Sequence, residues 1–222
     1  MMKKLLLLFI FLGTFSLGFA QTPSKKMSEL KEICLALRNN IGNEQIIFQT
    51  TNRYDRFMKE NVFTSDYTPL NKKILSGEEN IINDVTGKHI FFIPQYFRAL
   101  LEKRDGLFDK YEELLEEWET FTQQSARAAT GYMFRQENLI IRKGASVTFE
   151  LTVPKGYFDI MAVAETNAFL SMRIQDQSTG QYYITEKDAS AHKYFKFDSS
   201  TVFKVTIENV SQKDASIALF CF

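Results

Sequence analysis

The sequence predicts a protein of the α+β class, in which a mostly helical N-terminal region precedes a C-terminal antiparallel β-sandwich or jelly roll. Apolar residues recur at helical spacing in the first part of the chain, and after about residue 135 they alternate with polar residues at a period of two. About eight short alternating segments follow, with turn signals between them, which leaves no room for the crossover helices of a parallel sheet. We therefore expect a helical region at residues 21–137 and a β-sandwich domain at residues 138–222.

Residues 1–20 have the organisation of an export signal. Two lysines precede an apolar run over residues 5–19, and the small residue Ala20 stands before Gln21. The run is shorter than the roughly 20 residues of a transmembrane helix, so we predict a signal peptide that is cleaved after Ala20. We expect an exported protein, periplasmic or extracellular, that keeps no transmembrane segment after cleavage. Because Gln21 and not cysteine would begin the mature chain, we expect no lipoprotein anchor.

The charge balance argues against nucleic acids as partners. Cleavage would remove Lys3 and Lys4 from a chain with 27 basic and 27 acidic residues, which leaves a net charge of about −2. Such a chain offers neither a basic surface for nucleic acid nor a polybasic patch for a membrane. Its 45% hydrophobic and 14% aromatic residues are sufficient for a packed core, so we expect a soluble, folded protein.

The first helix of the mature chain is predicted over residues 28–42. Apolar residues recur there at three- and four-residue steps, and Gly42 provides a stop signal. These apolar residues are Leu30, Ile33, Cys34, Leu37 and Ile41. The fold of residues 43–93 is left open, because apolar residues from 46 to 58 fit a further helix whereas the segment after them contains turn signals.

Two more helices are predicted before the period changes. A short one follows Pro94, and a longer one covers residues 107–125. The longer helix has an apolar stripe formed by Leu107, Phe108, Tyr111, Leu114, Leu115, Trp118 and Phe121. Its other face carries Glu112, Glu113, Glu116 and Glu117. Carboxylates opposite an apolar stripe are typical of a solvated helix face, so we assign them no part in glycoside hydrolysis or cation binding.

The clearest strand is predicted at residues 147–153, where every second residue is apolar and Pro154-Lys155-Gly156 supplies a turn. Further strands are predicted at residues 139–142, 157–164, 169–176, 181–186, 193–197, 202–208 and 217–222. Their number and their spacing favour a small antiparallel sandwich.

The strand-and-turn pattern of the C-terminal part is carried by residues 139–144, 147–153, 157–160, 172–176, 179–180 and 203–209. This pattern resembles the pre-peptidase C-terminal β-sandwich, which is an accessory module of secreted bacterial proteins. The resemblance covers residues 138–222 only and implies a β-sandwich with an accessory role. Members often place acidic residues in the strand before the turn, some near bound calcium, but residues 169–174 contain none, so we transfer no metal site. Residues 28–135 resemble no family.

Common catalytic motifs are absent from the sequence. It contains no G-x-S-x-G, no H-E-x-x-H, no glycine-rich phosphate loop and no C-x-x-C, and its only histidines are His89 and His192. Cys34 would need one of these histidines as a base, and its place on an apolar stripe is typical of a buried thiol. His192 lies in a polar segment and is expected at the surface. We assign no catalytic, cofactor-binding or metal-binding residue, expect no cofactor, and favour a protein that is not an enzyme.

Cys34 and Cys221 leave two alternatives open. In an exported protein they can form a disulfide that ties the first mature helix to the last strand. Alternatively they are two separate buried thiols, because each one continues the apolar pattern of its neighbours. The sequence does not supply the separation of the two Cα atoms that would decide between them.

Aromatic residues of the predicted strands are candidates for facing a ligand. The candidates are Tyr157, Tyr182, Tyr183 and Tyr194. Exposed rings of this kind would form a stacking platform for sugar rings or a peptide, whereas buried ones would be core residues or cross-strand pairs.

These observations predict an exported bacterial protein that is not an enzyme and whose β-sandwich binds a protein partner, a glycan or a component of the cell envelope. One alternative is a hydrolase of envelope polymers that uses carboxylates of the helical region. Another is a structural subunit of an envelope complex that makes contact through the long helix. A pocket with two close carboxylates would favour the hydrolase, and an exposed aromatic strip would favour glycan binding.

Overall fold

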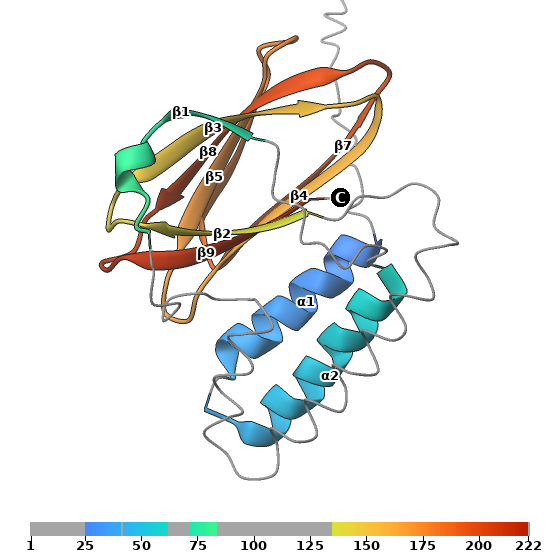
Figure 1. The fold of residues 1–222 in the computed structure, drawn as a ribbon, viewed down its shortest axis with the longest axis vertical. Helices are drawn as coiled ribbons and strands as arrows, with labels where there is room; N and C mark the ends of the chain where they lie inside the picture. Colours follow the sequence, from blue (N-terminus) through green and yellow to red (C-terminus); the bar gives the residue numbers. More distant parts are fainter. Residues whose placement is uncertain (1–24, 41, 62–71, 84–134, 222) are drawn as a thin grey trace, which may run out of the picture.

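Two N-terminal helices and two antiparallel β-sheets that pack as a sandwich make up the described part of the protein (Figure 1). The computed structural model describes residues 25–40, 42–61, 72–83 and 135–221. The predicted α+β class with a C-terminal antiparallel sandwich is confirmed. The expected signal peptide, His89 and the two helices predicted between residues 94 and 125, with Trp118 and the glutamate cluster, lie outside the described residues.

The two helices are α1 (Lys25–Asn39) and α2 (Glu44–Asn61). Helix α1 confirms the helix predicted at residues 28–42, and α2 shows that the apolar residues between 46 and 58 also belong to a helix. Among the described residues, neither helix is long and apolar enough to cross a membrane.

The described residues contribute nine strands to the sandwich. The five-stranded sheet has the order β1-β3-β8-β5-β6, and the four-stranded sheet has the order β2-β9-β4-β7. The strands are β1 (Lys72–Ser76), β2 (Arg135–Ile141), β3 (Ser146–Val153), β4 (Gly156–Ala164), β5 (Leu170–Asp176), β6 (Tyr182–Asp188), β7 (Ser190–Phe197), β8 (Thr201–Asn209) and β9 (Ala215–Cys221). All eight strands predicted after residue 138 are present as β2 to β9.

Strand β1 lies within residues 43–93, whose fold the sequence left open, and inside the region 21–137 that was predicted to be helical as a whole. It pairs antiparallel with β3, so that Ile74 lies opposite Phe149. Gly77 follows β1 with φ +82° and leads into the short 3-10 helix η1 (Glu78–Asn80). A Cβ atom on Gly77 would lie 2.2 Å from the carbonyl oxygen of Ser146, so only glycine fits this turn. The sandwich therefore takes one strand from residues before 138.

The main core lies between the two sheets and is built by the period-two alternation. In β3, Val147, Phe149 and Leu151 point inward and are buried, as the sequence predicted. At one end of this core three phenylalanine rings pack together. Phe203 lies with its ring centroid 5.8 Å from that of Phe158 and 4.8 Å from that of Phe195.

Helix α1 covers the outer face of the four-stranded sheet, as Figure 1 shows. Its apolar stripe is fully buried, with Leu30, Ile33 and Cys34 all at 0% exposure. These side chains join a second cluster, called here the helix–sheet cluster, made of Met27, Leu30, Ile33, Cys34, Leu37, Tyr54, Phe57, Met161, Val163, Ala218 and Phe220. Strand β9 is buried along its whole length, because the core covers one face and α1 covers the other.

Arg38 fixes the C-terminal end of α1 to the loop after β4. Its guanidinium donates hydrogen bonds to the carbonyl oxygens of Ala164 at 3.1 Å and Ala168 at 2.6 Å. In return, the hydroxyl of Thr166 donates to the carbonyl oxygen of Arg38 at 2.7 Å, which satisfies a helix-end acceptor. These bonds set the position of the helix along the sheet.

Cys34 and Cys221 lie on opposite faces of the four-stranded sheet. Cys34 belongs to the helix–sheet cluster, and Cys221 belongs to the core between the sheets. Both are buried, and no disulfide joins them in the structure. Burial raises the pKa of the Cys34 thiol well above its ordinary value. Whether the two thiols can pair in the exported protein stays a prediction.

Candidate functional site

Tyr157 and Tyr194 lie side by side on the outer face of the four-stranded sheet. In the register of β4 and β7, Tyr157 is opposite Lys196 and Asp159 is opposite Tyr194. The neighbouring residues Phe158 and Phe195 point into the core, so the tyrosines point outward. The two rings are stacked, with centroids 5.8 Å apart and an angle of 26° between their planes. Tyr157 remains 53% exposed.

Lys196 completes a surface that we call the tyrosine patch (Tyr157, Tyr194 and Lys196). Its Nζ lies over the ring of Tyr157, 5.5 Å from the centroid, in a cation–π arrangement. Lys196 forms no ion pair with a described residue. Two neighbours therefore hold the ring of Tyr157 in place, although more than half of that side chain is open to solvent.

Asp159 and His192 form a hydrogen-bonded pair beside the tyrosine patch, with 2.5 Å between Oδ1 and Nε2. Their side chains are only 3% and 6% exposed, so the prediction of a surface imidazole at His192 was wrong. The reason is that β7 begins at Ser190 and places His192 opposite Met161, a member of the helix–sheet cluster. Burial of both partners leaves Asp159 unsuited to act on a ligand at the surface.

The other two candidate tyrosines lie elsewhere in the sandwich. Tyr182 is 55% exposed on the outer face of β6, in the five-stranded sheet. Tyr183 points the opposite way, and its ring meets that of Phe195 edge-on at 4.8 Å. Burial, with the charge of Asp176, raises the pKa of Tyr183. The structure thus brings together Tyr157 and Tyr194, but not all four candidates.

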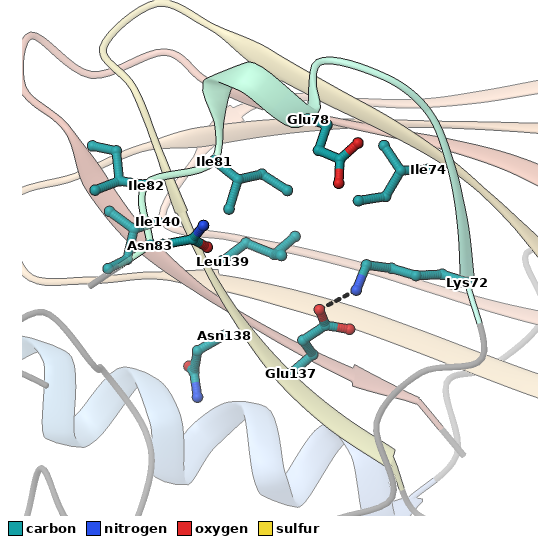
Figure 2. A pocket seen from close by; sticks show the side chains of 10 residues that line it. All are labelled: Lys72, Ile74, Glu78, Ile81, Ile82, Asn83, Glu137, Asn138, Leu139 and Ile140. Atoms are coloured by element: carbon teal, nitrogen blue, oxygen red, sulfur yellow. Dashed lines mark hydrogen bonds and ion pairs between the residues drawn. The ribbon is translucent and has the colours of Figure 1, made fainter. Parts of the chain in front are cut away.

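A pocket of about 510 Å³ opens at the edge of the sandwich where β1, η1 and β2 meet (Figure 2). We call it the edge pocket. It is lined by Lys72, Ile74, Glu78, Ile81, Ile82, Asn83, Glu137, Asn138, Leu139 and Ile140. Lys72 of β1 and Glu137 of β2 form an ion pair that bridges the two sheets. No sequence motif marks this pocket, and β1, which forms part of its wall, was not predicted.

Some polar atoms at the edge pocket have a hydrogen-bond partner, and others have none among the described residues. Lys72 binds Oε1 of Glu137, whereas Oε2 of Glu137 is buried with no hydrogen-bond partner among the described residues. Oδ1 of Asn138 is also buried without a partner there. Glu78 is exposed on η1 and forms no ion pair within the described ranges. In those ranges, no group of three or more His, Cys, Asp and Glu side chains is arranged to hold a metal ion.

Comparisons with known proteins identify no family. No known family matches the chain, and no curated protein matches it either. The mitogen of Yersinia pseudotuberculosis is a solved structure that is 11% identical, with 40% of this chain and 83% of the mitogen covered and a TM-score of 0.32. A family 29 carbohydrate-binding module is 7% identical, with 39% of this chain and 69% of the module covered and a TM-score of 0.27. The two sheets of the structure bear out the pre-peptidase resemblance only as far as a β-sandwich.

Proposed function

We propose that the β-sandwich is the glycan-binding module of an exported protein that has no enzymatic activity of its own. The observation that supports this function is the stacked pair of Tyr157 and Tyr194, with Tyr157 half exposed on the outer face of the four-stranded sheet. The large exposed ring is held by its neighbours and not by the core.

An exposed tyrosine suits a sugar ring for electrostatic and for solvation reasons. The face of an aromatic ring carries partial negative charge and attracts the positive C–H edges of other groups. A pyranose presents several C–H groups on one face, and stacking removes apolar area of both rings from water. The phenol hydroxyl and the Lys196 ammonium are then available as hydrogen-bond donors to sugar hydroxyls.

The tyrosine patch is also preorganised. Tyr157 lies on β4, an interior strand of its sheet. Its ring is held by Tyr194 and Lys196, which both belong to the neighbouring strand β7. A ring that is already ordered loses little conformational freedom on binding, which favours affinity. The pair provides a platform without the need for a rearrangement.

Binding is favoured over hydrolysis at this place. A glycosidase needs two carboxyl groups that reach the scissile bond. Asp159 is a described carboxylate next to the tyrosine patch, and it is 3% exposed and engaged by His192. The hydrolase alternative relies on carboxylates of the helical region, many of which lie outside the described residues.

The test is a comparison of two tyrosine variants in the full chain. Purified protein is screened against neutral and acidic envelope polysaccharides, and the strongest ligand is titrated by calorimetry. We expect Tyr157→Ala to weaken binding about tenfold, which corresponds to about 1.4 kcal/mol. Tyr182→Ala is the matched control, because Tyr182 has nearly the same exposure (55%) on the other sheet. Its affinity should stay within about twofold of the parent protein.

Two outcomes would overturn the proposal. If no polysaccharide binds the parent protein, glycan binding is not its function. If Tyr157→Ala and Tyr182→Ala weaken binding equally, the tyrosine patch is not the site. Circular dichroism of both variants verifies that the sandwich is intact.

A further inference from the structure

The edge pocket has the size and the lining of a small-molecule site. Its volume of about 510 Å³ lies within the range of roughly 300–1,000 Å³ that ligand pockets occupy. Leu139 and Ile140 are buried in its wall, and three further isoleucines from β1 and the segment after η1 are partly exposed. An apolar body of modest size therefore finds aliphatic contacts here.

The charges of the lining leave one negative charge in excess. Lys72 and Glu137 neutralise one another, and Glu78 remains. The carboxylate of Glu78 is exposed at the pocket, so the pocket favours a group that donates hydrogen bonds and carries positive charge. In Figure 2, Glu78 and Glu137 border the pocket from two different elements.

The segment that carries Glu78 is fixed on both sides. Nδ2 of Asn80 donates a hydrogen bond to the carbonyl oxygen of Ser146 at 3.0 Å, on the five-stranded sheet. The backbone N–H of Ile82 donates to the carbonyl oxygen of Ile140 at 2.8 Å, on the four-stranded sheet. The pocket therefore exists before a ligand arrives, and its acidic side chains stand on a defined backbone.

We propose that the edge pocket binds a small amphiphilic amine, with its ammonium group at Glu78 and its apolar body on Leu139 and Ile81. An anionic ligand is disfavoured, because the charge of Lys72 is already matched by Glu137. A neutral ligand lacks the charge that attracts an ammonium group to Glu78. This site is separate from the tyrosine patch and does not depend on glycan binding.

The first test varies only the charge of the probe. The full chain is titrated with 4-phenylbutylamine, 4-phenyl-1-butanol and 4-phenylbutyrate at neutral pH, and binding is followed by calorimetry and by chemical-shift changes at β1 and β2. We expect the amine to bind at least about tenfold more tightly than the butyrate, with the alcohol between them. Equal affinities for the three probes, or no binding of the amine, would overturn the proposal.

The second test locates the ammonium group. Glu78→Gln should weaken binding of the amine about fivefold or more and leave binding of the alcohol unchanged. Glu79→Gln is the matched control, because Glu79 is an exposed neighbour on η1 that does not line the pocket. Equal losses in the two variants would contradict a specific contact. Tyr157→Ala should leave binding of the amine unchanged, and a loss in that variant would contradict a separate site.

Discussion

Asp159 and His192 form an almost fully buried hydrogen-bonded pair on the outer face of the four-stranded sheet, with 2.5 Å between Oδ1 and Nε2. The pair lies between the tyrosine patch and the helix–sheet cluster, because Asp159 is opposite Tyr194 and His192 is opposite Met161. The pair therefore connects the tyrosine patch, which is proposed to bind glycan, with the helix–sheet cluster. A charged group in such a place needs its partner.

Asp159→Ala should destabilise the protein by about 3 kcal/mol, because it leaves the buried imidazole of His192 without its acceptor. The measurement is the free energy of unfolding from denaturant titration. Asp198→Ala serves as the control, since Asp198 is exposed and its removal should change stability by less than about 0.5 kcal/mol. Equal midpoints for the two variants would show that the pair contributes nothing to stability.

Leu30→Ala should destabilise the protein by about 2 to 5 kcal/mol, because Leu30 is fully buried in the helix–sheet cluster and its loss leaves a cavity. Glu32→Ala on the solvent side of the same helix is the comparison. Glu32 pairs with Arg53 at 3.0 Å with its side chain 70% exposed, and such surface pairs contribute less than about 1 kcal/mol. A shift for Leu30→Ala no larger than that of Glu32→Ala would argue that α1 does not pack on the sheet.

Cys34 and Cys221 should resist iodoacetamide at pH 8 in the folded protein and react once the chain is unfolded, because both are buried. Mass spectrometry counts the alkyl groups, and no uptake after unfolding without reductant would reveal a disulfide instead.

Burial raises the pKa of Cys34 in the folded state. The Cys34 thiol therefore loses its proton at a lower pH in the unfolded chain than in the folded protein. The free energy of unfolding, measured by denaturant titration, should fall as the pH rises above about 9.

The protein recovered from cells should begin at Gln21, as the order of basic, apolar and small residues in the first twenty positions predicts. Intact mass spectrometry of protein from the cell envelope and from the medium measures this directly. Replacing Ala20 with a bulky residue should leave the precursor uncleaved. Recovery of a mature chain that still starts at Met1 would contradict the export signal.

The sequence predicted those parts of the fold whose signals are local. The apolar alternation of residues 147–153 and the helical stripe of α1 each lie within one element, so both were visible without the structure. Strand β1 was missed, because its five residues show little alternation and it is defined by its pairing with β3. Pairing over that distance in sequence leaves no local signal.

The candidate sites depend even more on distant pairing. Tyr157 and Tyr194 meet only through the register of β4 and β7, whereas the adjacent Tyr182 and Tyr183 point to opposite faces of one strand. The edge pocket joins Lys72 and Glu137 from the edge strands of two different sheets. Residue type alone predicted candidates for a platform, but it did not predict which of them would be neighbours.

The position of β9 has a consequence for the order of folding during synthesis. This last described strand lies between β2 and β4 in its sheet, and its Phe220 packs against the first helix of the described chain. The cover of α1 thus combines α2 with residues of β4 and β9, which follow it at very different distances in sequence. A chain cut before residue 215 would lack the strand that lies between β2 and β4, and part of the apolar stripe of α1 would stay open to chaperones or to other chains. Contacts between residues far apart in sequence therefore complete the four-stranded sheet, which favours slow folding.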